Sequence, residues 1–126
     1  MLSLIIYIHG IINNIIFMID KKDIRDISGF ITDSSMWSID FANQVADEFD
    51  LNLTEKHWEI INLIRDLYEK TQKVPELRTI LKSVRLKNAE FKIDRKYIYN
   101  LFPYGYGQQA CKIAGMREPK KLWLDL

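Results

Sequence analysis

The feature that most constrains the fold is an amphipathic pattern in the middle of the chain, between Thr54 and Thr71. Apolar residues recur there at three- and four-residue spacing, which is the period of an α-helix with one wide buried face. Thr54 is a suitable N-cap residue. The apolar positions are Trp58, Ile61, Leu63, Ile64, Leu67 and Tyr68. The pattern predicts a central helix over Glu55–Thr71.

Shorter helices are predicted on both sides of this central helix. After three candidate N-cap residues, aromatic and aliphatic residues at every fourth position indicate a helix over Met36–Phe49. Pro75 suits the first position of a helix that runs to Leu86. Two further helices are predicted over Lys96–Phe102 and Gln108–Ala114. The fold class is therefore mainly α.

Three local features complete the expected architecture. Ile19–Thr32 alternates loosely around a Ser28-Gly29 turn signal, which favours a small β-hairpin or an irregular segment. The short Gln72–Val74 turn joins two consecutive predicted helices and allows a helix-turn-helix pair. Residues 116–126 lack periodicity and are expected to form an extended C-terminal arm.

The first seventeen residues differ from the rest of the chain, because they carry no charge and are rich in isoleucine. They lack the basic start and the cleavage site of a secretory signal. Polar residues also interrupt a run that is too short for a membrane span. We interpret 1–17 as an apolar extension or a mis-assigned start, with a membrane anchor as the alternative. The predicted division is 1–17, a helical domain over 18–115, and an arm over 116–126.

Composition narrows the class of function. The chain has 126 residues and a formal net charge of +1, with one cysteine and two histidines. One cysteine excludes an internal disulfide framework and a cysteine zinc cluster. We therefore expect a cytoplasmic protein without cofactor or metal. No nucleotide loop, Ser/His/Asp order or paired carboxylate indicates a known enzyme chemistry.

Charge is distributed unevenly along the chain. Asp20–Asp66 contains eleven acidic and five basic residues, whereas Lys70–Lys96 contains nine basic and three acidic ones. Such a basic segment can contact phosphates or an acidic partner, and a solvated basic face is the alternative. The candidate contacts with nucleic acid or a protein partner are Lys82, Arg85, Lys87, Arg95, Lys96 and Lys112.

Cys111 is the candidate reactive residue. It lies early in a predicted short helix, after a turn with two glycines, and beside Lys112. A helix N-terminus and a neighbouring cation both lower the pKa of a thiol and favour the nucleophilic thiolate. The alternative is a small buried residue that packs on Phe102 and Ile113. His57 begins the central helix, and we interpret it as a solvated side chain without a catalytic role.

Four segments together resemble the DsrC/TusE family. The matching segments are HWEIINLIRDLY (57–68), VPELRTILK (74–82), YIYNLFP (97–103) and QACKIAG (109–115). The family comprises the small partner of dissimilatory sulfite reductase and the related sulfur-relay protein of tRNA thiolation. The resemblance implies a compact orthogonal helical bundle with a small N-terminal hairpin and a mobile C-terminal arm.

The resemblance also implies where sulfur chemistry takes place. Family members carry sulfur as a persulfide or trisulfide on an inner cysteine and on a penultimate arm cysteine. Cys111 matches the inner position, but Leu122 stands at the arm position, and Trp123 stands where the family usually ends. With no second thiol, an intramolecular disulfide or trisulfide is impossible.

The expected function is sulfur trafficking, with persulfide sulfur accepted or relayed by Cys111. The expected partners are proteins of a sulfite reductase complex or of a tRNA-thiolation relay, and any enzymatic role is that of a sulfurtransferase component. The alternative is a regulatory or DNA-binding module without chemistry. The carrier hypothesis predicts that solvent reaches Cys111, whereas a sealed thiol leaves only docking.

Overall fold

The computed structural model describes residues 8–11, 24–87, 93–119 and 122–126, and these are mainly helical. The elements are η1 (Ser34–Met36), α2 (Ile39–Glu48), α3 (Glu55–Thr71), α4 (Leu77–Lys87), α5 (Arg95–Leu101), η2 (Tyr106–Ala110), α6 (Cys111–Ile113) and η3 (Leu122–Asp125). The predicted fold class, mainly α, is confirmed. Predicted and observed helices agree to within three residues at most ends.

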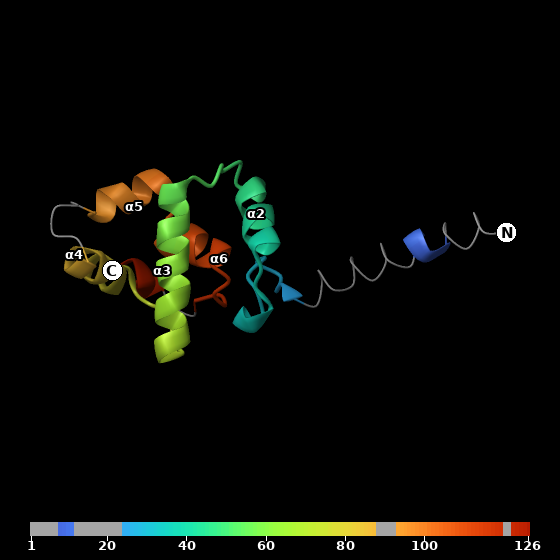
Figure 1. Cartoon of the computed structure of the whole chain (residues 1–126), viewed down its shortest axis with the longest axis horizontal. Coiled ribbons are helices and arrows are strands. Elements are labelled where there is room, and N and C mark those ends of the chain that lie inside the picture. Colours follow the sequence, from blue (N-terminus) through green and yellow to red (C-terminus); the bar gives the residue numbers. More distant parts are fainter. Residues whose placement is uncertain (1–7, 12–23, 88–92, 120–121) are drawn as a thin grey trace.

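Figure 1 shows α3 in the middle of the bundle, with α2 on one side and α4 and α5 on the other. The short helix α6 contacts both α2 and α3 and so connects these two helices. The largest fully buried side chains are Tyr106, Phe30, Phe102, Ile31, Ile60, Ile61, Ile64, Leu77, Ile80, Ile98, Ile113 and Met116. The core therefore includes α6, the helix that contains the candidate thiol of Cys111.

The central helix α3 has the bounds that its sequence pattern predicts. Thr54 is the N-cap, and Gln72 ends the helix in the left-handed conformation with φ +57°. Ile60, Ile61 and Ile64 are buried on one face. Trp58 and Leu67 are only partly buried and pack against the edge of the core.

The predicted N-terminal β-hairpin is wrong. In the part of Ile19–Thr32 that the structure describes, the single antiparallel contact is an isolated bridge between Arg25 and Ile31. The Asp26 carboxylate accepts hydrogen bonds from the amides of Ser28 (2.9 Å) and Phe30 (3.0 Å). The Arg25 guanidinium donates to the Gly29 carbonyl at 2.7 Å. These side-chain bonds close a tight turn, which two backbone hydrogen bonds also cross, from the Asp26 amide to the Phe30 carbonyl and from the Thr32 amide to the Ile24 carbonyl. The described residues therefore form a closed turn with one isolated bridge and no strand.

The last predicted helix begins earlier than expected and is not a regular α-helix. A π-helical turn, η2, precedes α6, and the Cys111 amide donates to the Tyr106 carbonyl five residues before it. Gly105 begins this turn with φ +103°, which favours glycine. The turn places Tyr106 and Cys111 on one side of the same short helical segment.

Two expectations concern the ends of the chain. Most of the apolar extension 1–17 lies outside the described residues, so its interpretation stays a prediction. Within the described ranges, no helix combines the length and the apolar character that a bilayer crossing requires. At the other end, the arm does not remain extended throughout, because Leu122–Asp125 forms a 3₁₀ turn that contacts α4 and η2.

Candidate functional site

Cys111 lies in the centre of the core. Its side chain is completely buried, in contact with a cluster that includes Phe102, Tyr106 and Ile113. The expectation that solvent reaches this thiol is therefore wrong for the structure described. The surroundings of Cys111 agree instead with the alternative interpretation, in which it is a small side chain packed among apolar neighbours.

The thiol is also poorly ionised. Burial raises the pKa of Cys111 to about 12, because a thiolate loses its hydration in the core. A hydrogen bond with Tyr106 opposes this rise, and the negative charge of Asp125 adds to it. Local sequence predicted the opposite direction. Cys111 is the first residue of α6, which is only three residues long, and desolvation outweighs the dipole of so short a helix.

Lys112 does not face the thiol. Its ammonium group lies 5.2 Å from the ring centre of Phe30 and 5.4 Å from that of Phe49, on the side of α6 that meets α2. Both distances suit a cation–π interaction. Lys112 is therefore engaged within the fold and provides no stabilising charge for a Cys111 thiolate.

The C-terminal end of α6 is closed by side chains from the first half of the chain. The Trp37 indole donates to the Ile113 carbonyl at 2.9 Å, and Arg65 donates to the Ala114 carbonyl at 2.8 Å. Arg65 also lies 4.2 Å from the ring centre of Trp37. Gly115 ends the helix with φ +78°, and a Cβ atom there would lie 2.3 Å from the Trp37 ring. This end is rigidly packed.

The N-terminal end of the same segment is closed by the end of the chain. One carboxylate oxygen of Asp125 accepts hydrogen bonds from the Tyr106 amide (2.9 Å) and the Tyr99 hydroxyl (2.7 Å). The other accepts from the Gly107 amide at 2.8 Å. Arg95 donates to the carbonyl oxygens of Asp125 and Leu126. A carboxylate thus occupies the anion-binding position in front of the first turn.

Tyr106 connects this end of the segment with the thiol. Its amide is bound by Asp125, and its buried hydroxyl donates to the Pro75 carbonyl at 2.5 Å. Tyr106 and Cys111 belong to the same buried cluster. Burial raises the pKa of Tyr106 well above its ordinary value, so this hydroxyl stays protonated. Asp125 and Pro75 therefore fix one of the side chains of the cluster that contains Cys111.

A cleft of about 500 Å³ lies beside these groups. Its walls come from the Asp26–Thr32 turn, from Val74, from the arm residues Arg117–Pro119, and from Leu124. Val74 and Leu124 are the sequence neighbours of the two residues that hold Tyr106. In the described part of the structure, this cleft therefore lies next to the residues that hold Tyr106.

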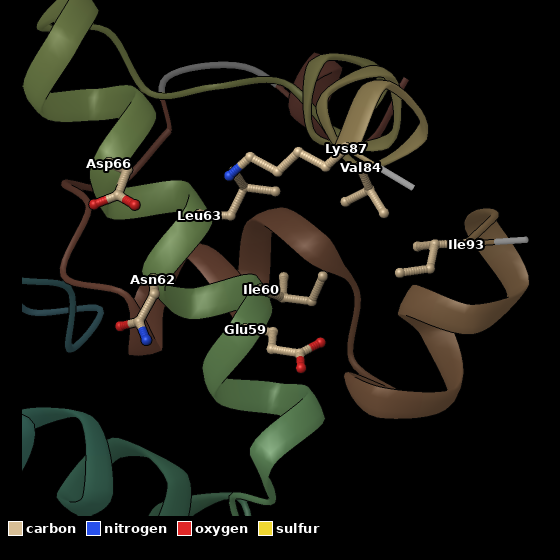
Figure 2. Close-up of a pocket in the computed structure, with 8 residues that line it drawn as sticks. All are labelled: Glu59, Ile60, Asn62, Leu63, Asp66, Val84, Lys87 and Ile93. Atoms are coloured by element: carbon tan, nitrogen blue, oxygen red, sulfur yellow. The ribbon is translucent and has the colours of Figure 1, made fainter. Parts of the chain in front are cut away.

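A second pocket, of about 460 Å³, lies between α3, α4 and Ile93, two residues before α5 (Figure 2). Apolar side chains form part of its lining, while two α3 carboxylates and Lys87 of α4 stand at its edge. The lining residues are Glu59, Ile60, Asn62, Leu63, Asp66, Val84, Lys87 and Ile93. None of them is a thiol or a histidine, so this pocket offers no sulfur chemistry.

The six basic residues predicted as nucleic-acid or partner contacts differ in their surroundings. Lys82, Arg85 and Lys87 are exposed on α4, and Lys96 is exposed on α5. Arg95 instead binds the end of the chain, and Lys112 binds aromatic rings. The consecutive helices α3 and α4 are present and in contact, but the structure gives no specific support for a helix-turn-helix motif.

His57 is buried, contrary to the expectation of a solvated side chain. Its Nδ1 atom accepts a hydrogen bond from the Thr54 amide at 3.1 Å, and its Nε2 atom lies 2.8 Å from the Leu101 carbonyl oxygen. The ring thus caps α3 and joins it to the end of α5. Its role in the described structure is positional.

Sequence reasoning missed Asp125, Tyr99 and Tyr106 as parts of the site. The Gly105–Gly107 turn was a local signal for an anion-binding backbone, but the residue that occupies it lies eighteen positions away from the nearer glycine. No spacing rule connects the two. Among the described residues, no group of His, Cys, Asp and Glu side chains is suited to hold a metal ion.

The comparisons with known proteins agree with this fold. The family model described as DsrC like protein matches residues 18–122. A sulfurtransferase TusE of Pectobacterium atrosepticum is 38% identical over 96 residues, which cover 76% of this chain and 88% of the relative. None of these descriptions concerns DNA, so the DNA-binding alternative is without support.

Solved structures of the same family are equally similar. The NMR structure of Allochromatium vinosum DsrC has a TM-score of 0.69 and 39% identity, and the match covers 77% of this chain and 87% of that one. The crystal structure of the oxidized gamma-subunit of the dissimilatory sulfite reductase (DsrC) from Archaeoglobus fulgidus has a TM-score of 0.69 and 34% identity, with 76% and 88% covered. The chain therefore belongs to the DsrC family.

Proposed function

We propose that this chain is a sulfur-relay protein that docks to protein partners and carries sulfane sulfur on Cys111 after the thiol has been uncovered. The support for relay is the similarity to relatives named as sulfurtransferase and as sulfite reductase subunit. In the structure described, Cys111 is sealed, and in that state the chain can only dock, so the carrier role requires that the thiol be uncovered first. A reducing cytoplasm is the compartment that suits a carrier with one free thiol.

The transfer step is a thiol–persulfide exchange. The Cys111 thiolate attacks the outer sulfur of a donor persulfide, R–S–SH, and forms Cys111–S–SH. The donor S–S bond breaks, and the donor leaves as the thiolate R–S⁻. One S–S bond is formed and one is broken, so no external oxidant or reductant is needed. Passing the sulfur to an acceptor thiolate is the same step in reverse.

The closed structure is inactive in this chemistry. With a pKa of about 12, about one thiol in 10⁵ is ionised at pH 7. The nucleophile is also inaccessible to a protein donor. Uncovering the thiol restores its hydration, which lowers its pKa toward the ordinary value and provides access. Docking and chemistry are therefore coupled through the same local opening.

Persulfide loading tests this function. The full chain is incubated with glutathione persulfide and, separately, with a persulfide-loaded protein donor, and its intact mass is measured. The expected result is a gain of one sulfur atom that the protein donor produces faster than the small one. Cys111→Ser, which should show no gain, is the control for the site. Absence of loading by either donor contradicts the carrier role.

A second candidate function is docking without sulfur transfer, and the burial of Cys111 favours it directly. In that case the chain occupies the binding site of a family member that has an arm cysteine. The predicted result is that Cys111→Ser competes as well as the unmodified chain for a sulfur-relay partner in a pull-down. Loss of competition in Cys111→Ser contradicts a docking role that is independent of the thiol.

A further inference from the structure

Two hollows lie on opposite sides of the central helix α3 and meet at one residue. The pocket of about 460 Å³ between α3 and α4, called here the α3–α4 pocket, lies on one side (Figures 1 and 2). On the other side lies a hollow of about 500 Å³, called here the α2–α3 pocket, which is lined by Trp37, Ile39, Asn43, Trp58 and Asn62. Asn62 is exposed and lines both pockets. The surface of α3 is thus a ridge at Asn62 with a hollow on each side.

Both pockets have apolar walls that a partner can reach. In the α3–α4 pocket, Ile60 and Leu63 of α3 lie opposite Val84 of α4 (Figure 2). In the α2–α3 pocket, two tryptophans lie beside Ile39, whose side chain is 60% exposed. Apolar hollows of this kind hold the anchoring side chains of binding partners. Each pocket therefore offers a site for one large apolar side chain.

The two pockets differ in charge. The lining of the α2–α3 pocket contains no charged residue. The α3–α4 pocket has the carboxylates of Glu59 and Asp66 on its α3 side and the ammonium group of Lys87 on its α4 side. Both carboxylates are exposed, and the ion pairs of the described residues involve neither of them. Since Glu59, Asn62 and Asp66 follow one another at three- and four-residue spacing, they share one side of α3. A cation placed over Asn62 therefore faces two carboxylates.

The width of the ridge sets the spacing of the groups that can bind on both of its sides. A helix with its side chains is about 10 Å wide, and two residues seven positions apart in a helix are also separated by about 10 Å, on the same face. A partner helix that crosses α3 can thus place residue i in one pocket and residue i+7 in the other. Its positions i+3 and i+4 then lie over the ridge, where lysine or arginine meets Glu59 and Asp66.

We propose that the Asn62 ridge and its two flanking pockets are a docking surface for an amphipathic helix of a protein partner, with apolar residues at i and i+7 and basic residues at i+3 and i+4. This inference rests on the proposed function for its biological meaning, because it names the surface on which a relay partner is held. Cys111 lines neither pocket, so docking and sulfur transfer use different residues.

The charge of the surface and the pattern of α4 argue against two other occupants. Exposed carboxylates repel a phosphate backbone, which disfavours nucleic acid. A second copy of this chain could offer Leu86 of α4, which is 79% exposed and lies between two basic residues. The residue seven positions earlier is Thr79, however, so α4 provides one apolar anchor where the surface takes two.

The first test is a titration of the ¹⁵N-labelled full chain with a synthetic alanine-based helical peptide of about 18 residues. The peptide carries leucines at i and i+7 and arginines at i+3 and i+4. Saturable shifts are expected at the backbone amides of 58–66, 39–43 and 84–87. A peptide with glutamates in place of the arginines, and one with its leucines at i and i+4, should each bind at least fivefold more weakly. Absence of saturable binding, equal affinities of the three peptides, or shifts confined to other surfaces overturn the proposal.

Variants of exposed residues test the two recognition elements separately. Asp66→Lys should weaken binding of the arginine peptide about fivefold and strengthen binding of the glutamate peptide. Asp47→Lys, an equal change of charge at an exposed position of α2, is the matched control and should leave both affinities nearly unchanged. Ile39→Ser should weaken both peptides alike, about fivefold, because it removes an apolar wall.

Two results of these variants would contradict the proposal. Equal effects of Asp66→Lys and Asp47→Lys would mean that only the net charge of the chain matters. A chain that is dimeric without peptide, and that Asp66→Lys converts to a monomer, would assign the surface to a second copy. Size-exclusion chromatography of both proteins measures this second outcome.

Sulfur loading of Asp66→Lys distinguishes failure of the docking surface from failure of the relay function. Slower loading by a persulfide-loaded protein donor, with unchanged loading by glutathione persulfide, supports both. Unchanged loading by both donors leaves the relay function intact and overturns this surface as its docking site. If the unmodified chain accepts sulfur from neither donor, the carrier role fails, and the peptide titration alone decides the docking surface.

Discussion

The two ends of the helical segment that carries Cys111 are both closed by distant residues, but by different kinds. At the C-terminal end, Trp37 and Arg65 bind the Ile113 and Ala114 carbonyls from within the bundle. At the N-terminal end, Asp125 binds two backbone amides from the last turn of the chain. The hydrogen-bonding need is similar, since helix ends expose unpaired backbone groups. The difference is that an indole and a guanidinium donate to carbonyls at the first end, whereas a carboxylate accepts from amides at the second.

The comparison indicates that the two ends contribute differently to stability. At the C-terminal end, Arg65 lies over the Trp37 ring, and both side chains also bind carbonyls, so variants there should lower the free energy of unfolding strongly. At the N-terminal end, the contacts to the backbone come from one carboxylate, so variants there should lower it less.

The largest expected effect is that of Gly115→Ala. A left-handed backbone with φ +78° strains alanine, and its Cβ atom would meet Trp37 at 2.3 Å. Strain and overpacking together should lower the free energy of unfolding by about 3 kcal/mol. Urea denaturation measures it. Gly29→Ala is the matched control, with φ +86° but only ends of flexible side chains nearby, and should cost about 1 kcal/mol. Equal losses would show that Trp37 does not make the end rigid.

The next effect is that of Arg65→Met, which removes the donor to the Ala114 carbonyl and the cation over Trp37. A partly buried carbonyl without its partner and a lost cation–π contact should lower stability by about 2 kcal/mol. Arg78→Met is the control, because Arg78 forms an exposed ion pair, and it should change stability by less than about 0.5 kcal/mol. A similar small loss in both variants would contradict the rigid closure.

A smaller effect on the free energy of unfolding should appear when the pH is raised. The pKa of the Cys111 thiol is raised from 9.0 to about 12 in the folded chain. The folded state thus keeps a proton that the unfolded state releases, so this contribution to stability is complete below pH 9 and is lost between pH 9 and about 12.

The slope in that range should be about 1.4 kcal/mol per pH unit. Unfolding free energies are compared at pH 8 and pH 10 for the unmodified chain and for Cys111→Ala, which lacks the titrating group. Parallel pH profiles of the two proteins would mean that the thiol ionises in the folded state and that its enclosure is looser than described.

The smallest effect on stability should be that of Gly107→Ala, at the N-terminal end of the segment. The added methyl group would displace the Asp125 carboxylate, which is the movable end of a side chain. The free energy of unfolding, measured by urea denaturation, should fall by about 1 kcal/mol because a charge-assisted hydrogen bond is weakened. Gln108→Ala, at an exposed neighbouring position, is the control and should change it by less than about 0.5 kcal/mol. A loss as large as that of Gly115→Ala would contradict the difference between the two ends.

The predicted helices succeeded where short-range pattern decides the structure. The bounds of α3 and its Thr54 cap follow from the spacing of its apolar residues. The N-cap residues predicted before the helix at 36–49 belong to η1 instead, where Asp33 accepts from the Ser35 amide, and Ser38 caps α2. The hairpin prediction was wrong, because the Asp26 carboxylate binds two amides of its own turn and the described antiparallel pairing is limited to one isolated bridge.

For the candidate site, too, some features follow from the sequence and others only from the tertiary structure. Sequence alone identified Cys111 as the one thiol, the glycine turn before it, and the family resemblance, since these depend only on which residues occur and at what spacing. Tertiary structure determined the burial of that thiol and the direction in which its pKa is shifted. It also determined the orientation of Lys112 toward aromatic rings and the binding of Asp125 to the glycine turn. The physical reason is that desolvation and these contacts arise between residues far apart in the chain, and no local pattern records which distant group will cover a given atom.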